Sequence, residues 1–186
     1  MVNVIDSIIW RRIDTPGHDV CRLEGSNYGW QLEGAAVFLH EGVPAHLAYH
    51  VMCDFGWRTR QGQVYGWLGT NSVDFSITRA IDGEWTMNGA VVSGLGACID
   101  LDFGFTPATN LLQLRRLSLA QGQTVNNPVA WLDVLEGTLE ILNQRYERRT
   151  EVAYWYEAAK FDYAAVLEVR PTGFIHSYPG LWEAER

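Results

Sequence analysis

The fold is decided by the stretch Pro44-Ala45-His46-Leu47-Ala48-Tyr49-His50-Val51-Met52-Cys53-Asp54. Successive side chains of an extended strand point to opposite faces of a sheet. One face of this stretch then carries Ala45, Leu47, Tyr49, Val51 and Cys53. The other face carries two histidines and an aspartate, so the alternation predicts an antiparallel strand with one side on a core.

The same period of two recurs along the chain. Residues 97–103, 139–149 and 161–170 all alternate in this way, and turn signals separate the runs. These signals are Glu41-Gly42-Val43-Pro44, Ile81-Asp82-Gly83-Glu84 and Pro171-Thr172-Gly173. Turns at such spacing are typical of a sandwich, barrel or meander. We therefore predict a mainly β fold, a curved antiparallel sheet with at most two short helices.

Helix signals are weak. A short helix is expected over residues 129–136, after Pro128, whereas residues 111–119 are interpreted as a strand. That interpretation sends Arg115 and Arg116 to opposite faces of the sheet. Gly62 is expected at a bulge or a close approach of the backbone, and residues 88–96 are expected to form a surface loop. With no linker or repeat, residues 1–186 are expected to form a single domain.

Composition restricts the classes of partner. The chain has 186 residues, of which 47% are hydrophobic and 19% charged, enough to bury a sizeable core. No apolar run reaches the length of a membrane helix. A net charge of −8 repels nucleic-acid phosphates and anionic membrane surfaces. We expect neither nucleic acid nor stable membrane insertion, and homo-oligomerisation stays open.

Cysteines and the N-terminus point to a compartment. Three cysteines, Cys21, Cys53 and Cys98, cannot all pair within one chain, and none is in a Cys-x-x-Cys spacing. The first residues lack the basic segment and long apolar stretch of a signal peptide. A reducing compartment, the cytoplasm, fits both features.

Aromatic side chains are abundant, with 8 tryptophans, 8 tyrosines and 7 phenylalanines. Tryptophan suits places where an apolar body meets a polar edge, such as a ligand pocket. We expect some of these residues to line a cavity; the alternative is a large closed β core. The candidates are Trp10, Trp30, Trp57, Trp67, Tyr154 and Trp155.

Catalytic, cofactor and metal motifs are not found. There is no Gly-x-Ser-x-Gly motif, and residues 94–99 do not complete Gly-x-Gly-x-x-Gly. His46 and His50 would lie about 13 Å apart on a strand, too far for one metal ion. Asp100 and Asp102 would share a face about 7 Å apart, a spacing that paired carboxylates in glycosidases use. The simpler interpretation is that the two carboxylates are ordinary residues of a solvated face. The alternative is an enzyme acting on a lipid or glycoside, with Asp100/Asp102 or His50 as acid or base.

Polar groups within apolar alternation mark two segments, residues 100–116 and 144–156. Gln144, Tyr146 and Arg148 share one strand face. An arginine flanked by apolar side chains must meet carboxylates, carbonyls or a ligand. We expect Arg148 to face a cavity, with a ligand head group or Asp100 and Asp102 as its partner.

These segments resemble the bacterial putative glycolipid-binding domain family over essentially the whole chain. The resemblance is carried by Gly104-Phe105-Thr106-Pro107-Ala108-Thr109-Asn110, Arg115-Arg116-Leu117, Gln144-x-Tyr146-x-Arg148 and Tyr178-Pro179-Gly180-Leu181-Trp182. It implies a spiral β-roll, similar to half-barrel lipid and lipoprotein carriers, with an internal cavity.

The leading hypothesis is non-catalytic binding of an amphipathic, lipid-like ligand, the glycolipid that the resemblance implies, without a cofactor. An enzyme on such a ligand and a structural or oligomerising module are the alternatives. The candidate ligand-binding residues are Arg148, Tyr146, Gln144, Arg115, Arg116, Asp102, Asn110, Tyr154, Tyr178 and Trp57.

Overall fold

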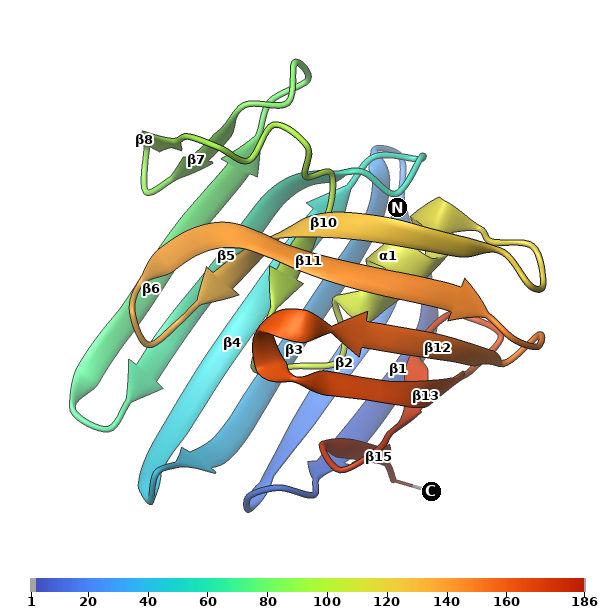
Figure 1. Ribbon diagram of the computed structural model, residues 1–186. Coiled ribbons are helices and arrows are strands. Elements are labelled where there is room, and N and C mark those ends of the chain that lie inside the picture. Colours follow the sequence, from blue (N-terminus) through green and yellow to red (C-terminus); the bar gives the residue numbers. More distant parts are fainter. Residues whose placement is uncertain (1–2, 186) are drawn as a thin grey trace.

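The computed structural model describes residues 3–185, which form one open, strongly curved sheet of fifteen strands (Figure 1). Strand order is β8-β7-β6-β5-β4-β3-β2-β1-β15-β14-β13-β12-β11-β10-β9. The first eight strands are β1 (Asn3–Arg12), β2 (Gly17–Ser26), β3 (Gly29–His40), β4 (Val43–Cys53), β5 (Thr59–Leu68), β6 (Asn71–Arg79), β7 (Trp85–Met87) and β8 (Ala90–Val92). The prediction of a mainly β, curved, open sheet is confirmed.

The remaining elements form the second half of the roll. They are β9 (Leu101–Phe103), α1 (Asn110–Leu117), β10 (Thr124–Asp133), β11 (Thr138–Arg148), β12 (Ala153–Ala158), a short 3-10 helix (Ala159–Phe161), β13 (Tyr163–Val169), β14 (Ile175–Tyr178) and β15 (Trp182–Ala184). Strand β9 pairs with β10 in parallel, and the other pairs are antiparallel. The last strand, β15, pairs with β1, so the chain's two ends join the halves into one sheet. No helix of residues 3–185 has the length and apolarity needed to cross a membrane.

The stretch of residues 44–54 forms most of β4, as predicted. Its five alternating apolar side chains are at most 3% exposed, whereas His46, Ala48 and His50 on the other face are half-buried. Neighbouring strands bury their matching faces in the same way, so the concave side of the roll is the core.

Helix α1 corrects the strand expected over residues 111–119. Figure 1 shows it between the first strands and the layer of β10 to β13. Leu111, Leu112 and Leu114 are buried, and so are Asn110 and Gln113. The helix has only eight residues, too few for a 3.6-residue period to stand out, and two of its polar residues, Asn110 and Gln113, are buried. Arg115 and Arg116 are therefore neighbours on a helix, not residues on opposite strand faces.

The helix expected over residues 129–136 is wrong as well. Strand β10 runs through Pro128 to Asp133. Proline cannot donate a ladder hydrogen bond. The short strand β9 pairs only with residues 130–132, so at Pro128 the side of β10 away from β11 is an edge. Two smaller differences remain. The loop expected over residues 88–96 contains the short strand β8. The strand pattern expected from residue 161 begins later, because Phe161 ends the 3-10 helix.

Strand β9 packs on β5, where β10 and β11 cross over β4 to β6 (Figure 1). A Cβ atom at Gly62 would overlap the side chain of Leu101 and lie 3.4 Å from the ring of Phe103. The close approach expected at Gly62 is thus confirmed, and glycine allows the two layers to meet.

We predict that Gly62→Ala lowers the free energy of unfolding by about 1–3 kcal/mol, because the fully buried Leu101 must shift. The control is Gly96→Ala, where nothing lies within 4 Å of the added methyl group. This exposed site should change stability by less than about 0.5 kcal/mol. Urea denaturation measures both values, and equal stability of the two variants would contradict the prediction.

Candidate ligand-binding cavity

A cavity of about 420 Å³ lies beside the first residue of α1, between the two halves of the roll. Nine aromatic side chains line it: Phe38, Phe103, Phe105, Trp131, Tyr156, Phe161, Tyr163, Tyr178 and Trp182. Leucines at positions 47, 68, 132, 135, 142 and 181 add further apolar surface to its walls. Such a composition is typical of a small-molecule site.

Two aromatic groups shape the walls. Tyr156, Tyr163 and Tyr178 contact one another with ring centroids 5.4–6.1 Å apart. Phe103 and Phe105 stack at 5.5 Å with an interplanar angle of 10°. The Tyr163 hydroxyl donates a hydrogen bond to the carbonyl of Pro179 (2.6 Å), which fixes that ring. These contacts order the walls before any ligand arrives.

Arg12 brings a positive charge to the lining. Its guanidinium lies over the rings of Phe38 and Trp182, 4.9 and 5.0 Å from their centroids. It also forms a bidentate pair with Asp14, at 3.0 and 2.7 Å. A charged group thus lies directly against the aromatic wall, so the cavity combines an ionic part with an apolar part.

A buried polar cluster closes the end of the cavity next to α1. Asp102 is 6% exposed and accepts hydrogen bonds from Thr109 (2.7 Å) and Gln144 (2.5 Å). Burial raises the pKa of Asp102, and those two hydrogen bonds oppose the rise. Asn110 donates to the Tyr146 hydroxyl at 2.8 Å. The asparagine and aspartate therefore offer polar atoms within an otherwise apolar site.

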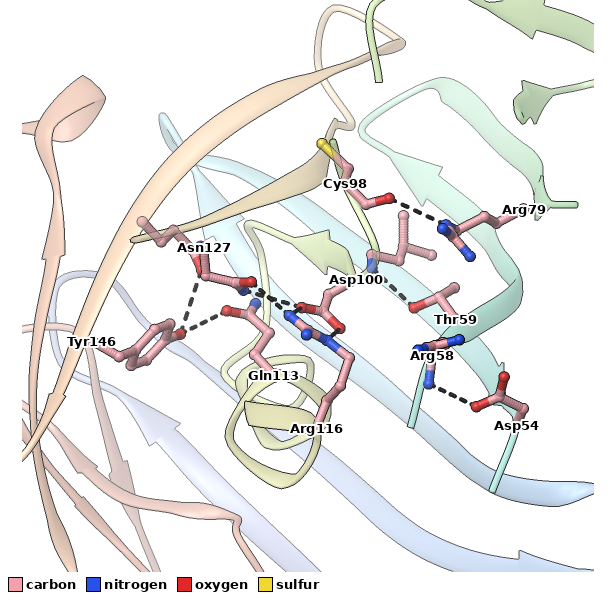
Figure 2. Close-up of polar contacts among 12 residues, drawn as sticks. Asp54, Arg58, Thr59, Arg79, Cys98, Asp100, Gln113, Arg116, Asn127 and Tyr146 are labelled. Atoms are coloured by element: carbon pink, nitrogen blue, oxygen red, sulfur yellow. Dashed lines mark hydrogen bonds and ion pairs between the residues drawn. The ribbon is translucent and has the colours of Figure 1, made fainter. Parts of the chain in front are cut away.

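Tyr146 connects this cluster to the middle of α1. Its hydroxyl donates to Oε1 of Gln113 at 2.8 Å, as Figure 2 shows. Burial raises the pKa of Tyr146 well above its usual value, so the phenol stays neutral and keeps its proton for this bond.

Asp100 plays a different part from Asp102. Both of its oxygens accept from Arg116, each at 2.7 Å, and Asn127 donates to it at 3.0 Å (Figure 2). Arg116 also donates to Asn127 at 2.6 Å. The carboxylate is fully buried, and a bidentate arginine pair is among the strongest charge-assisted contacts. This contact ties α1 to the segment before β9 and to β10.

We predict that Arg116→Ala lowers the free energy of unfolding by about 3–5 kcal/mol, because it leaves the Asp100 carboxylate buried and unpaired. Arg115→Ala, next to it on the same helix, is the matched control and should cost less than about 1 kcal/mol since Arg115 is exposed. Thermal and urea melts measure both. Similar losses in the two variants would contradict this assignment.

A second buried carboxyl lies behind the cavity wall. Thr106 lines the cavity and hydrogen-bonds to Asp19, which also accepts from the Tyr49 hydroxyl at 3.1 Å. Burial raises the pKa of Asp19 to about 8, although both hydrogen bonds lower it. Thr106 and Tyr49 hydroxyls are 3.2 Å apart, so neutral Asp19, Thr106 and Tyr49 can each donate one bond in a closed ring.

This carboxyl gives stability a pH dependence of known sign. In the folded state Asp19 keeps its proton to about pH 8, but in the unfolded chain it loses it near 3.8. The folded form therefore binds more protons, and the free energy of unfolding falls as pH rises through that window. We predict that Asp19→Asn removes this contribution. The stability of wild type minus that of the variant should decrease from pH 4 to pH 8 in urea denaturation, by no more than about 1.4 kcal/mol per pH unit. A difference that is constant or increases with pH would be inconsistent with a protonated Asp19.

The ten residues proposed from sequence fall into three groups. The cavity is lined by Asp102, Asn110 and Tyr178. The buried polar contacts behind it contain Gln144, Tyr146 and Arg116. A second pocket, at the last turn of α1, is lined by Trp57, Arg115, Arg148 and Tyr154. The predicted residues therefore do not form one site: three of them line the aromatic cavity and four line the second pocket.

The ion pair expected between Arg148 and Asp100 or Asp102 is wrong. The Arg148 guanidinium pairs with neither Asp100 nor Asp102 but donates to the backbone carbonyls of Leu119, Thr150 and Glu151, at 2.8, 3.2 and 3.3 Å. Arg116 takes the place beside Asp100, because α1 lies inside the roll.

Of the six aromatic residues expected to line a cavity, none lines this one, although Trp57 and Tyr154 line the second pocket. Trp10 is fully buried in the core and donates to the carbonyl of Ile175 at 2.7 Å. Trp30, Trp67 and Trp155 do not line the cavity. Tyr156, Trp131 and Trp182 do, and sequence reasoning missed them. Tyr156 was accessible to that reasoning, since it shares a strand face with Tyr154; Trp131 lay in the wrongly expected helix.

The groups of the enzymatic alternative are not brought together. His50 lies on the face of β4 opposite to Tyr49, Asp100 is paired with Arg116, and only Asp102 lines the cavity. Among residues 3–185, no three His, Cys, Asp or Glu side chains lie where they could hold a metal ion.

The architecture defines a class: an open β-roll with one helix inside it and an aromatic-lined cavity beside that helix. The chain belongs to the family described as "Putative glycolipid-binding", which matches residues 7–184. It is also similar to the crystal structure of a DUF1089 family protein from Pseudomonas aeruginosa. That likeness has a TM-score of 0.81 and 26% sequence identity, and it covers 90% of this chain and 91% of the other. No curated protein matches the chain.

Proposed function

We propose that this protein binds an amphipathic, lipid-like molecule in the cavity without transforming it, and that the ligand is a glycolipid. The observation that carries the proposal is the cavity itself, with nine aromatic side chains around it and polar atoms of Asp102 and Asn110 at one end. The family's description supports a glycolipid as the class of ligand.

The apolar walls suit an acyl chain. A volume of about 420 Å³ lies within the range of small-molecule sites. Burial contributes about 0.8 kcal/mol per methylene, so roughly eight methylenes supply about 6 kcal/mol. A micromolar Kd corresponds to about 8 kcal/mol, so an acyl chain provides most of the affinity and a polar head group the remainder.

Asn110 favours a ligand that carries a hydroxyl group. Its amide nitrogen is bonded to Tyr146, whereas its side-chain oxygen accepts no hydrogen bond within residues 3–185. A purely apolar ligand would cover this oxygen without pairing it, at a cost of about 1–3 kcal/mol. A sugar hydroxyl would pair with it, which favours a glycolipid over a plain hydrocarbon.

The thiols fit a cytoplasmic location. Cys21, Cys53 and Cys98 are free and buried, and burial raises the pKa of the Cys98 thiol to about 11. Buried, protonated thiols are unreactive side chains of a core, as expected in a reducing compartment.

Ala158→Phe tests the proposed site. Ala158 lines the cavity and is 1% exposed, so a phenyl group there should occupy the space of the ligand. We predict that wild-type protein binds dansyl-labelled undecanoic acid, that octyl glucoside displaces it, and that the substitution raises both dissociation constants at least about tenfold.

The matched control is Ala48→Phe, on the half-buried face of β4 away from the core. It should leave both constants unchanged, and circular dichroism should show that both variants are folded. Failure of the wild-type protein to bind either compound, or equal binding by Ala158→Phe, would overturn the proposal.

A further inference from the structure

A second pocket, of about 280 Å³, lies at the other end of α1. We call it the arginine pocket and define it by Trp57, Arg115, Arg148, Tyr154 and Arg170. It shares no lining residue with the aromatic cavity. The arginine pocket is therefore separate from the aromatic cavity.

Two of the three guanidinium groups, those of Arg115 and Arg148, form no ion pair within residues 3–185, whereas Arg170 pairs with Asp6. Arg115 makes no hydrogen bond and no ion pair with any side chain or carbonyl of residues 3–185 and lies 5.2 Å over the ring of Trp57. Arg148 donates to backbone carbonyls alone. Arg170 donates to the carbonyl of Ser7 at 3.2 Å and lies 3.6 Å from Asp6. Besides Asp6, the nearby carboxylate is that of Glu151, an exposed residue of the lining.

An unpartnered hydroxyl group accompanies these charges. Tyr154 is only 6% exposed and lines the pocket, yet its hydroxyl has no hydrogen-bond partner within residues 3–185. Burial raises the pKa of Tyr154, and the nearby Arg148 and Arg115 lower it. The Arg148 guanidinium lies over this ring, 5.7 Å from its centroid, and the phenol stays protonated and can donate to a ligand.

Trp57 holds the third side of the pocket in an unusual backbone conformation. Its φ is 64°, in the left-handed region that bulky residues rarely occupy. The Asp54 carboxylate holds this turn by accepting from the backbone N–H groups of Gly56 and Arg58. The indole stacks on Trp30 at 4.7 Å and supports Arg115 from the other side. Strain of this kind is concentrated at functional sites.

We propose that the arginine pocket binds the phosphoryl group of a small phosphorylated molecule. Guanidinium groups present parallel N–H donors that match phosphate oxygens, and a neutral tyrosine adds a further donor. Three arginines gathered in a chain of net charge −8 concentrate positive potential where the rest of the protein would repel an anion. The phosphoryl group belongs either to a free phosphate ester or to a lipid head group. This site is independent of the aromatic cavity.

Isothermal titration with inorganic phosphate, at constant ionic strength and pH 7.5, tests the site in the full chain. We expect saturable binding with a Kd below about 1 mM. Arg115→Gln removes a charge that holds no other contact besides the Trp57 ring, so it should weaken binding at least about tenfold without lowering Tm. Arg149→Gln is the control, because Arg149 lies over Trp155, 4.7 Å from the ring centroid and outside the pocket.

A parallel titration with dihexanoyl phosphatidic acid separates the two sources of the phosphoryl group. Tighter binding than inorganic phosphate would assign the pocket to a lipid head group, and equal binding to a soluble phosphate. Absence of saturable binding to either compound would overturn the proposal, as would an equal loss in Arg149→Gln. Ala158→Phe should still bind phosphate, which distinguishes failure here from failure of the cavity.

Discussion

An open, curled sheet has a concave face that must be filled, and α1 is the element that fills it. Its position is set by polar groups that are costly to bury unpaired. Arg116 meets Asp100, and Gln113 meets the Tyr146 hydroxyl (Figure 2). Asn110 donates to the same hydroxyl. Because these bonds join the helix to β10 and β11 and to the segment before β9, the helix cannot shift without breaking several of them. The remaining arrangement of the roll follows from this constraint.

The helix is shorter than the space that it occupies. Eight residues span about 12 Å, so room is left beyond both of its ends. At the first turn, aromatic side chains of β3, β9, β10 and β12 to β15 surround the larger space, and Asn110 supplies an acceptor there. At the last turn, Arg115 meets Arg148 and Tyr154 in the smaller space. One short helix thus separates an apolar site from a cationic one, and each suits a different chemical group.

Local patterning predicted much of the fold but less of the site. Period-two alternation located β4 and β11, because one face of each of these strands is buried and the other is not. The same rule failed for α1, which is only eight residues long and buries polar as well as apolar side chains. The partner of Arg148 could not be predicted, since it depends on where α1 enters the roll. The aromatic lining was predicted in kind, but its members come from strands far apart in sequence.

The central claim is that the space beside the first turn of α1 holds an amphipathic molecule. Native mass spectrometry of freshly purified protein, with and without the Ala158→Phe change, tests it most directly. The wild type is predicted to carry a bound molecule that organic solvent extracts and that fragments into an acyl chain and a polar head. The variant should lack it. A wild type that is free of any such molecule, and that stays free of it after incubation with octyl glucoside, would contradict the account.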